Sequence, residues 1–214
     1  MTQAIKDHAI ELASSLAEAA GGFYQRGWAV GTSGNFSAVV CSEPLRLVIT
    51  ASGMDKGRLT TDQFVQVDDA GKVIAGAGRP SDETKLHLTI VRQRQAQSIL
   101  HTHSIWSTVL SDLLINDGGV EITGYEMLKG LAGVRTHEHQ EWLPILDNSQ
   151  DMDELARKLE ELLHRRPDAH GFLLRGHGLY TWGQSVSEAR RHVEILEFLL
   201  EVVGRVRFAT GTRA

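Results

Sequence analysis

Short strand-like runs alternate with amphipathic helical stretches along the chain, and the first four strand-like runs form two pairs with very short connections. Residues 36–41 and 46–50 are joined around Pro44, and residues 63–67 and 72–75 by a turn ending at Gly71. Such close spacing indicates antiparallel hairpins. Because helical patterns occur as well, we predict a single α/β domain over residues 1–214, with a mixed, largely antiparallel central sheet flanked by helices.

The rest of the chain adds helices and shorter strands to this sheet. Apolar residues at helical spacing predict a first helix that ends near Gly21–Gly22 and a second that is capped by Ser81. Strand-like runs lead into His101 and lie on both sides of His177. Further helices are predicted at 105–115, 151–164 and 186–207, with a short one near Tyr125.

Composition and charge exclude several classes of protein. Hydrophobic residues make up 42% of the 214 residues and charged residues 23%, which is typical of a globular domain. A net charge of −5 gives no electrostatic reason to bind nucleic acid or an anionic membrane. Cys41 is the only cysteine, so no internal disulfide can form. Charges in the first residues exclude a signal peptide, and no apolar run spans a bilayer. We therefore expect a cytoplasmic protein.

Three histidines suggest a metal site. His101 and His103 are two residues apart at the end of a predicted strand, so their side chains point to the same side. His177 follows a glycine and precedes another, which lets the backbone approach closely. Three protein ligands leave a coordination position open for substrate, as in catalytic zinc sites, although iron and manganese also suit histidine. The sequence predicts one such cation, best assigned as zinc, per subunit.

The other histidines have simpler interpretations. His137 and His139 form a second H-x-H pair, but the surrounding THEHQE segment is polar throughout and indicates an exposed hairpin. An H-x-H pair by itself is also consistent with histidines that only form hydrogen bonds near a strand end. For the remaining five, surface or core positions within or beside helices are expected: His8, His87, His164, His170 and His192.

Five segments in order resemble the class II aldolase family: GTSGNFS (31–37), ITASGMDKG (49–57), GRPSDET (78–84), HTHS (101–104) and RGHGLYTWG (175–183). The resemblance extends from Gly27 to about Val203. It implies a zinc enzyme that acts on a small phosphorylated ketose. It also implies a homotetramer with active sites near the subunit interfaces.

The same resemblance assigns a phosphate pocket. Gly34, Asn35, Ser52, Gly53 and Ser81 match the family's positions in residue type. Amide, hydroxyl and backbone N–H donors beside glycines suit a phosphate monoester, and Ser81 precedes a predicted helix whose positive end attracts anions. In isolation each of these segments is an ordinary turn. Lys56 is left open, as either a phosphate contact or a surface lysine.

Two glutamates compete for the proton-transfer role. Glu83 matches the catalytic glutamate of the aldolases, whereas Glu126, in GYEMLKG (124–130), matches the acid/base position of dehydratases in the family. The latter segment favours dehydration with Glu126 as the main acid/base group. Aldol cleavage or epimerisation of a sugar phosphate, with Glu83 essential, is the alternative. A non-enzymatic module like the aldolase-shaped heads of cytoskeletal proteins is disfavoured, because the three metal histidines are present.

Overall fold

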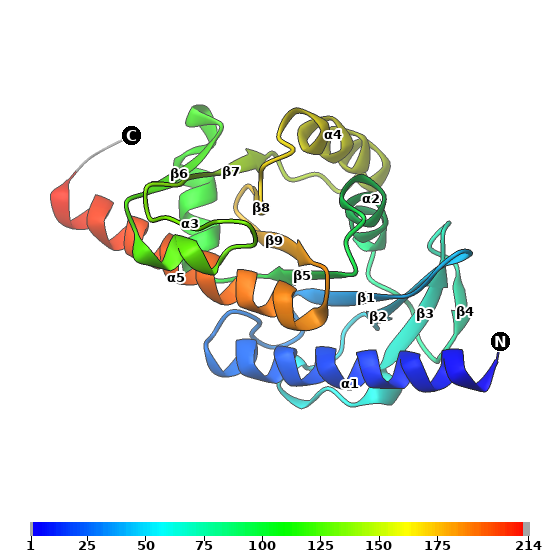
Figure 1. Cartoon of the computed structure of the whole chain (residues 1–214). Helices are drawn as coiled ribbons and strands as arrows, with labels where there is room; N and C mark the ends of the chain where they lie inside the picture. Colours follow the sequence, from blue (N-terminus) through cyan, green and yellow to red (C-terminus); the bar gives the residue numbers. More distant parts are fainter. Residues whose placement is uncertain (1, 212–214) are drawn as a thin grey trace.

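A computed structural model describes residues 2–211, and its centre is a sheet of nine strands in the order β4-β3-β2-β1-β5-β9-β8-β7-β6 (Figure 1). The strands are β1 (Asn35–Ser42), β2 (Leu45–Thr50), β3 (Phe64–Asp68), β4 (Val73–Ala75), β5 (Ser98–Thr102), β6 (Gly119–Thr123), β7 (Gln140–Leu146), β8 (Gly171–Leu174) and β9 (Gly178–Gly183). Neighbouring strands are antiparallel except β7 and β8, which are parallel. The prediction of a mixed, largely antiparallel sheet in an α/β fold is confirmed.

Within the described part of the chain, five α-helices cover the sheet: α1 (Gln3–Gln25), α2 (Thr84–Arg94), α3 (Ile105–Leu113), α4 (Met152–Arg165) and α5 (Val186–Thr210). Figure 1 shows α1 and α5 on one side of the sheet and α2 and α4 on the other. No helix within residues 2–211 is long and apolar enough to cross a membrane. The cytoplasmic location stays a prediction.

Alternation along the strands divides the core between the two faces. On β1, Phe36, Ala38 and Val40 pack in the cluster with α1, whereas Val39 belongs to the cluster with α2 and α4. On β5, Ile99 packs on the α2 side and Leu100 on the α1 side. Because side chains alternate, His101 shares the α2 side with Ile99.

The strand directions define two ends of the sheet. We call the "His101 end" the one at which β5, β7 and β8 finish and β6 and β9 begin, and the opposite one the "His170 end". The pairings His101–Tyr180, Leu174–Gly178, Leu146–Leu174 and Gly119–Pro144 fix this assignment. Asn35, which begins β1, pairs with His101 and so also lies at the His101 end.

Three features differ from the sequence-based expectations. Strands β6 and β7 were not predicted, and Pro144 within β7 is tolerated where the strand pairs only with β6. Helix α1 continues through Gly21–Gly22, because Ala19, Ala20 and Phe23 pack into the core there. Helix α2 begins at Thr84, and its N-cap is Glu83 rather than Ser81.

Candidate metal centre and substrate pocket

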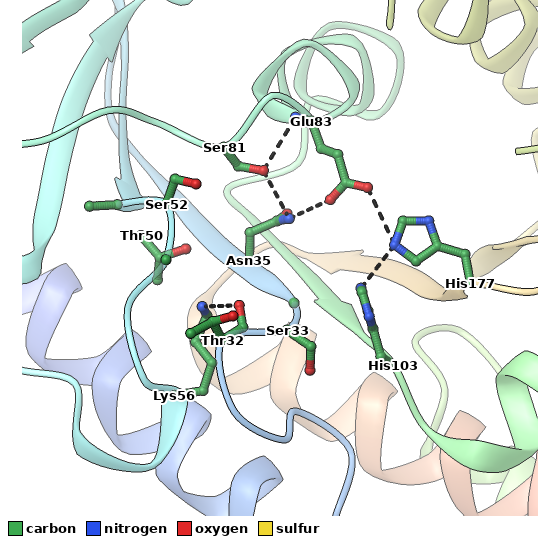
Figure 2. A pocket seen from close by; sticks show the side chains of 13 residues that line it. Thr32, Ser33, Asn35, Thr50, Ser52, Lys56, Ser81, Glu83, His103 and His177 are labelled. Atoms are coloured by element: carbon green, nitrogen blue, oxygen red, sulfur yellow. Dashed lines mark hydrogen bonds and ion pairs between the residues drawn. The ribbon is translucent and has the colours of Figure 1, made fainter. Parts of the chain in front are cut away.

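The ring nitrogens of three histidines meet at the His101 end of the sheet. His101 is the fourth residue of β5, His103 follows that strand, and His177 lies in the turn between β8 and β9. The Nε2 of His103 is 2.7 Å from that of His101 and 3.0 Å from that of His177, and the His101–His177 distance is 3.3 Å. Figure 2 shows His103 and His177 facing each other across the edge of a pocket.

The protonation of these rings suits a metal ion. His101 donates through Nδ1 to the carbonyl oxygen of Leu179 at 2.9 Å, which leaves a lone pair on Nε2. Burial lowers the pKa of His101 well below its ordinary value and that of His103 to about 4. Both rings are therefore neutral near pH 7. Converging lone pairs on imidazoles fit a divalent transition metal, and a three-histidine set leaves one position for an oxygen ligand.

Glycines and helix α3 place His177. Gly176 has a φ of +59°, and a Cβ on Gly178 would clash with the carbonyl oxygen of Thr102. The backbone N–H of Gly176 donates to Ser111 Oγ at 3.0 Å, and Thr108 Oγ1 donates to the His177 carbonyl, also at 3.0 Å. The turn is thus held against the strand that carries His101.

Glu83 lies beside the histidines. One carboxylate oxygen is 3.6 Å from His101 Nε2. The other is 3.5 Å from His177 Nε2, and Asn35 Nδ2 donates to the carboxylate at 2.5 Å (Figure 2). Asn35 is held in turn by His87, whose Nε2 donates to Asn35 Oδ1 and whose Nδ1 accepts from Ser37 Oγ at 2.7 Å. Burial lowers the pKa of His87 to about 3, so this ring is neutral. Sequence reasoning missed His87, because its role depends on partners about 50 residues away.

A polar cavity of about 250 Å³ adjoins the histidines. All five predicted phosphate residues line it, together with Glu83, His103 and His177. The structure adds Thr32, Ser33 and Thr50, which sequence reasoning did not single out. The two amide hydrogens of Asn35 are already engaged, by Glu83 and by Ser81 Oγ at 3.2 Å. Hydroxyl and backbone groups are therefore the more available donors.

Lys56 is the lysine among the described residues that line this cavity. Its side chain is only 1% exposed, and Nζ donates to the carbonyl oxygens of Thr32 at 2.9 Å and Met54 at 3.0 Å. An ammonium group has three hydrogens, so one remains for a ligand. Burial lowers the pKa of Lys56 to about 8, despite the opposing effect of Asp55. The surface interpretation of this lysine is wrong.

Glu126 lies away from the three histidines. It follows β6, which ends at the His170 end, and β6 alone extends about 17 Å. Glu126 does not line the cavity, and its side chain is 70% exposed. A hydrogen bond and charge attraction from Lys129 lower its pKa. An isolated chain therefore does not give Glu126 the raised pKa of a general acid.

A second group of histidines occupies the His170 end. His139 and His170 contact the carboxylate of Glu141, which is 1% exposed, at 2.9 and 2.8 Å. The expectation of an exposed hairpin holds for His137 and Glu138 but is wrong for His139, which is partly buried. The ligand atoms of this group also lie close enough for a metal ion.

Comparison with known proteins identifies relatives of this chain. The family model for the class II aldolase and adducin N-terminal domain matches residues 14–203. Methylthioribulose-1-phosphate dehydratase of Pseudoalteromonas translucida is 46% identical, with 87% of each chain covered. The protein of that name from Methylococcus capsulatus is 45% identical over 91% of this chain and 93% of its own.

A solved structure agrees in fold. YgbL of Escherichia coli, described as a candidate aldolase, epimerase or decarboxylase, superposes with a TM-score of 0.78 at 27% identity, covering 92% of this chain and 90% of its own. The chain belongs to the class II aldolase and adducin N-terminal domain family.

Proposed function

We propose that the protein is a hydro-lyase that converts 5-methylthioribulose 1-phosphate to 2,3-diketo-5-methylthiopentyl 1-phosphate and water, a step of methionine salvage. The carrying observation is the 45–46% identity, over nearly the whole chain, with relatives named methylthioribulose-1-phosphate dehydratase. The cavity supports this assignment, because it joins a candidate metal group to a polar compartment suited to phosphate.

One zinc ion per subunit is the proposed cofactor, held by His101, His103 and His177. When bound, it supplies a Lewis acid for the C2 carbonyl oxygen of the ketose, which acidifies the neighbouring C3–H. Lys56 and the hydroxyls of Ser52 and Ser81 bind the phosphate, and the backbone N–H groups of Gly34 and Gly53 approach it closely. A phosphate in this position orients the sugar so that its C2–C3 bond faces Glu83.

Two carboxyl groups divide the proton transfers. Glu83, held by Asn35 beside the histidines, removes the proton from C3. Glu126 donates a proton to the departing C4 hydroxyl, and water leaves. The resulting enol then tautomerises to the diketone. The acid role requires a pKa above that of the exposed carboxylate, so Glu126 must be covered by other protein atoms during turnover.

A neighbouring subunit provides that cover in the proposed homotetramer. Glu126 lies at the sheet end opposite the histidines, so within one chain it cannot reach the cavity. We propose that Glu126 of one subunit acts in the pocket of the next. Mixing subunits tests this. We expect Glu126→Gln and His177→Ala to be inactive separately, whereas hybrids of the two should regain about a quarter of wild-type activity, because random pairing leaves about that fraction of sites with both residues intact. Hybrids without activity would refute action across the interface.

The substrate assay separates the two candidate reactions. Purified protein with zinc is incubated with 5-methylthioribulose 1-phosphate, and diketone absorbance is followed. A parallel reaction with fuculose 1-phosphate is assayed for dihydroxyacetone phosphate. Aldol cleavage or epimerisation is retained as the second candidate because Glu83 lies beside the histidines. Cleavage without diketone formation would refute the dehydratase proposal.

A further inference from the structure

We propose that Glu141, His170 and His192 form a brace that positions the segment Glu126–Val134, and with it the carboxylate of Glu126. All three residues lie outside the cavity at the His101 end. The inference rests on the proposed role of Glu126. It assigns a role to His170 and His192, for which sequence reasoning expected only ordinary core or surface positions.

The brace holds both backbone groups of a single residue. The N–H of Ala132 donates to His192 Nε2 at 3.0 Å, and His170 Nε2 donates to the carbonyl oxygen of Ala132 at 2.8 Å. His192 belongs to α5, whereas His170 immediately precedes β8. A loop residue is thus fixed from two elements that are themselves part of the core.

The remaining ring nitrogens settle the protonation of each histidine. His192 Nδ1 donates to the carbonyl oxygen of Trp182 at 2.7 Å, so its Nε2 carries a lone pair and the ring is neutral. His170 Nδ1 faces Glu141 Oε2 at 2.8 Å, while its Nε2 faces a carbonyl oxygen. Because the pKa of Glu141 is lowered and its carboxylate can only accept, both nitrogens of His170 donate, and the ring is an imidazolium ion. His192 is thus neutral, whereas His170, whose ring centroid is 5.6 Å away, carries a positive charge.

Charges around the rings agree with this assignment. Burial and the like charge of His170 lower the pKa of His192, while Glu188 opposes and Arg191 adds to this effect. Burial lowers the pKa of His170, but the hydrogen bond and charge of Glu141, together with the charge of Asp168, outweigh burial and raise this pKa. Burial also opposes ionisation of Glu141, but hydrogen bonds from His170 and His139 outweigh it and lower the pKa. The pair Glu141–His170 is therefore ionised near pH 6.

The segment has a rigid base and an exposed tip. Leu128 and Leu131 are buried with α5, a Cβ on Gly130 would clash with Ile195, and Arg191 donates to the Gly130 carbonyl at 2.9 Å. Glu126, by contrast, contacts only the exposed side chains of Lys129 and His137 among the ion pairs of residues 2–211. The brace therefore fixes where the exposed carboxylate is presented to a neighbouring subunit. A displacement of about 1 Å at such a group can cost about 100-fold in rate.

Hydrogen bonds account for this group without a metal ion. His139 Nε2 and His170 Nδ1 both contact one oxygen, Glu141 Oε2, at hydrogen-bond distances. The other oxygen accepts the backbone N–H of His170 at 3.1 Å. A proton on each ring nitrogen satisfies these atoms. A bound cation is the competing explanation, and zinc analysis of Glu141→Gln detects it.

The test uses the zinc-loaded enzyme with His192→Phe and Glu141→Gln, and Glu138→Gln as the exposed control. His192→Gln is the conservative variant, because its amide oxygen can accept from Ala132. We expect faster amide hydrogen exchange across residues 126–134 and a kcat lowered by about 100-fold, with KM and zinc content unchanged. His192→Gln should recover part of the kcat. If His192→Phe does not fold, the hydrogen exchange and kcat of Glu141→Gln and His192→Gln test the brace.

Three outcomes separate the possible failures. Unchanged exchange in residues 126–134, or unchanged kcat despite faster exchange, overturns the brace. Loss of one equivalent of zinc in Glu141→Gln, with the other retained, overturns it in favour of a metal site. Full activity of Glu126→Gln instead overturns the proposed acid and the catalytic consequence of the brace, while the hydrogen-bonding brace itself is still judged by exchange.

Discussion

The two ends of the sheet each gather histidines, but in opposite hydrogen-bonding roles. At the His101 end, three rings face one another through Nε2, and His101 is neutral because its Nδ1 donates to a backbone carbonyl. At the His170 end, the rings face a buried carboxylate and a carbonyl oxygen instead of one another. The first group can offer lone pairs to a cation, whereas the N–H groups of His139 and His170 in the second group donate hydrogen bonds to oxygen atoms. The partner of each ring nitrogen, rather than the number of histidines, therefore distinguishes the candidate metal centre from the proposed brace.

The largest expected difference between the two ends is in metal content. His177→Ala should lose the bound zinc and reduce turnover by orders of magnitude, because two imidazoles hold the ion far more weakly than three. His139→Ala should keep zinc at one equivalent per chain. Elemental analysis of both variants after dialysis measures this. Equal zinc loss in the two variants would show that the two groups of histidines do not differ in metal binding.

Removal of the carboxylate at the His101 end should affect chemistry more than binding. Glu83→Gln keeps the hydrogen bond with Asn35 available but removes the base, so kcat should fall by about 10²–10⁴-fold. Steady-state kinetics and zinc analysis test this, with Asp82→Asn as the exposed neighbour. Retention of near wild-type kcat would show that Glu126 alone carries the proton transfers.

Lys56 should affect substrate binding specifically. Lys56→Met removes a charged donor, and a charge-assisted hydrogen bond contributes about 1.5–3 kcal/mol, so KM should rise roughly 10- to 100-fold. Lys72→Met, at an exposed position, should leave KM unchanged. A thermal melt must show that the variant is folded, because Lys56 also bonds two backbone carbonyls. An unchanged KM would remove Lys56 from the phosphate site.

At the His170 end, we expect the smallest effect, and it is measured most directly by the pH dependence of stability. Glu141→Gln should lower the free energy of unfolding by about 1–3 kcal/mol, because a buried charged partner is lost. The lowered pKa of Glu141 makes its contribution present above the ordinary value of 4.5 and lost as pH falls through the folded pKa. The raised pKa of His170 makes its contribution complete below 6.5 and lost as pH rises through the folded value.

The stability difference between wild type and Glu141→Gln should therefore be largest between pH 4.5 and 6.5. Urea unfolding at a series of pH values measures it, and Glu138→Gln provides the control. A difference that does not depend on pH would argue against the ion pair.

Much of the fold could be predicted from local patterns. The two early hairpins, β5, β8, β9 and the long helices have periodicities or turn residues that are visible in short windows. Strands β6 and β7 could not be found in this way, because Gly119 and Pro144 weaken their pattern. They are held by pairing with each other and, in the case of β7, also with β8. Gly21–Gly22 was misleading because tertiary packing outweighs a cost of about 1 kcal/mol per glycine.

Part of the cavity lining could be predicted from the sequence, but its geometry could not. Motif positions were sufficient to place Ser52, Ser81 and Glu83 around one cavity. The distance of Glu126 from that cavity depends on strand direction, which no local pattern encodes. The tasks of His87 and His170 depend on what each ring nitrogen contacts, and those contacts come from distant parts of the chain. The metal, phosphate and acid roles stay predictions.

The pairing of β5 with β9 has a consequence for the order of folding. His101 and His177 are 76 positions apart, and only this pairing brings them together. Closing so long a loop is slow compared with forming the hairpins at the beginning of the chain. During synthesis, the chain must be elongated past Gly183 before the three imidazoles can capture an ion, so a ribosome-bound fragment that ends within α4 is expected to bind zinc no better than an unfolded peptide.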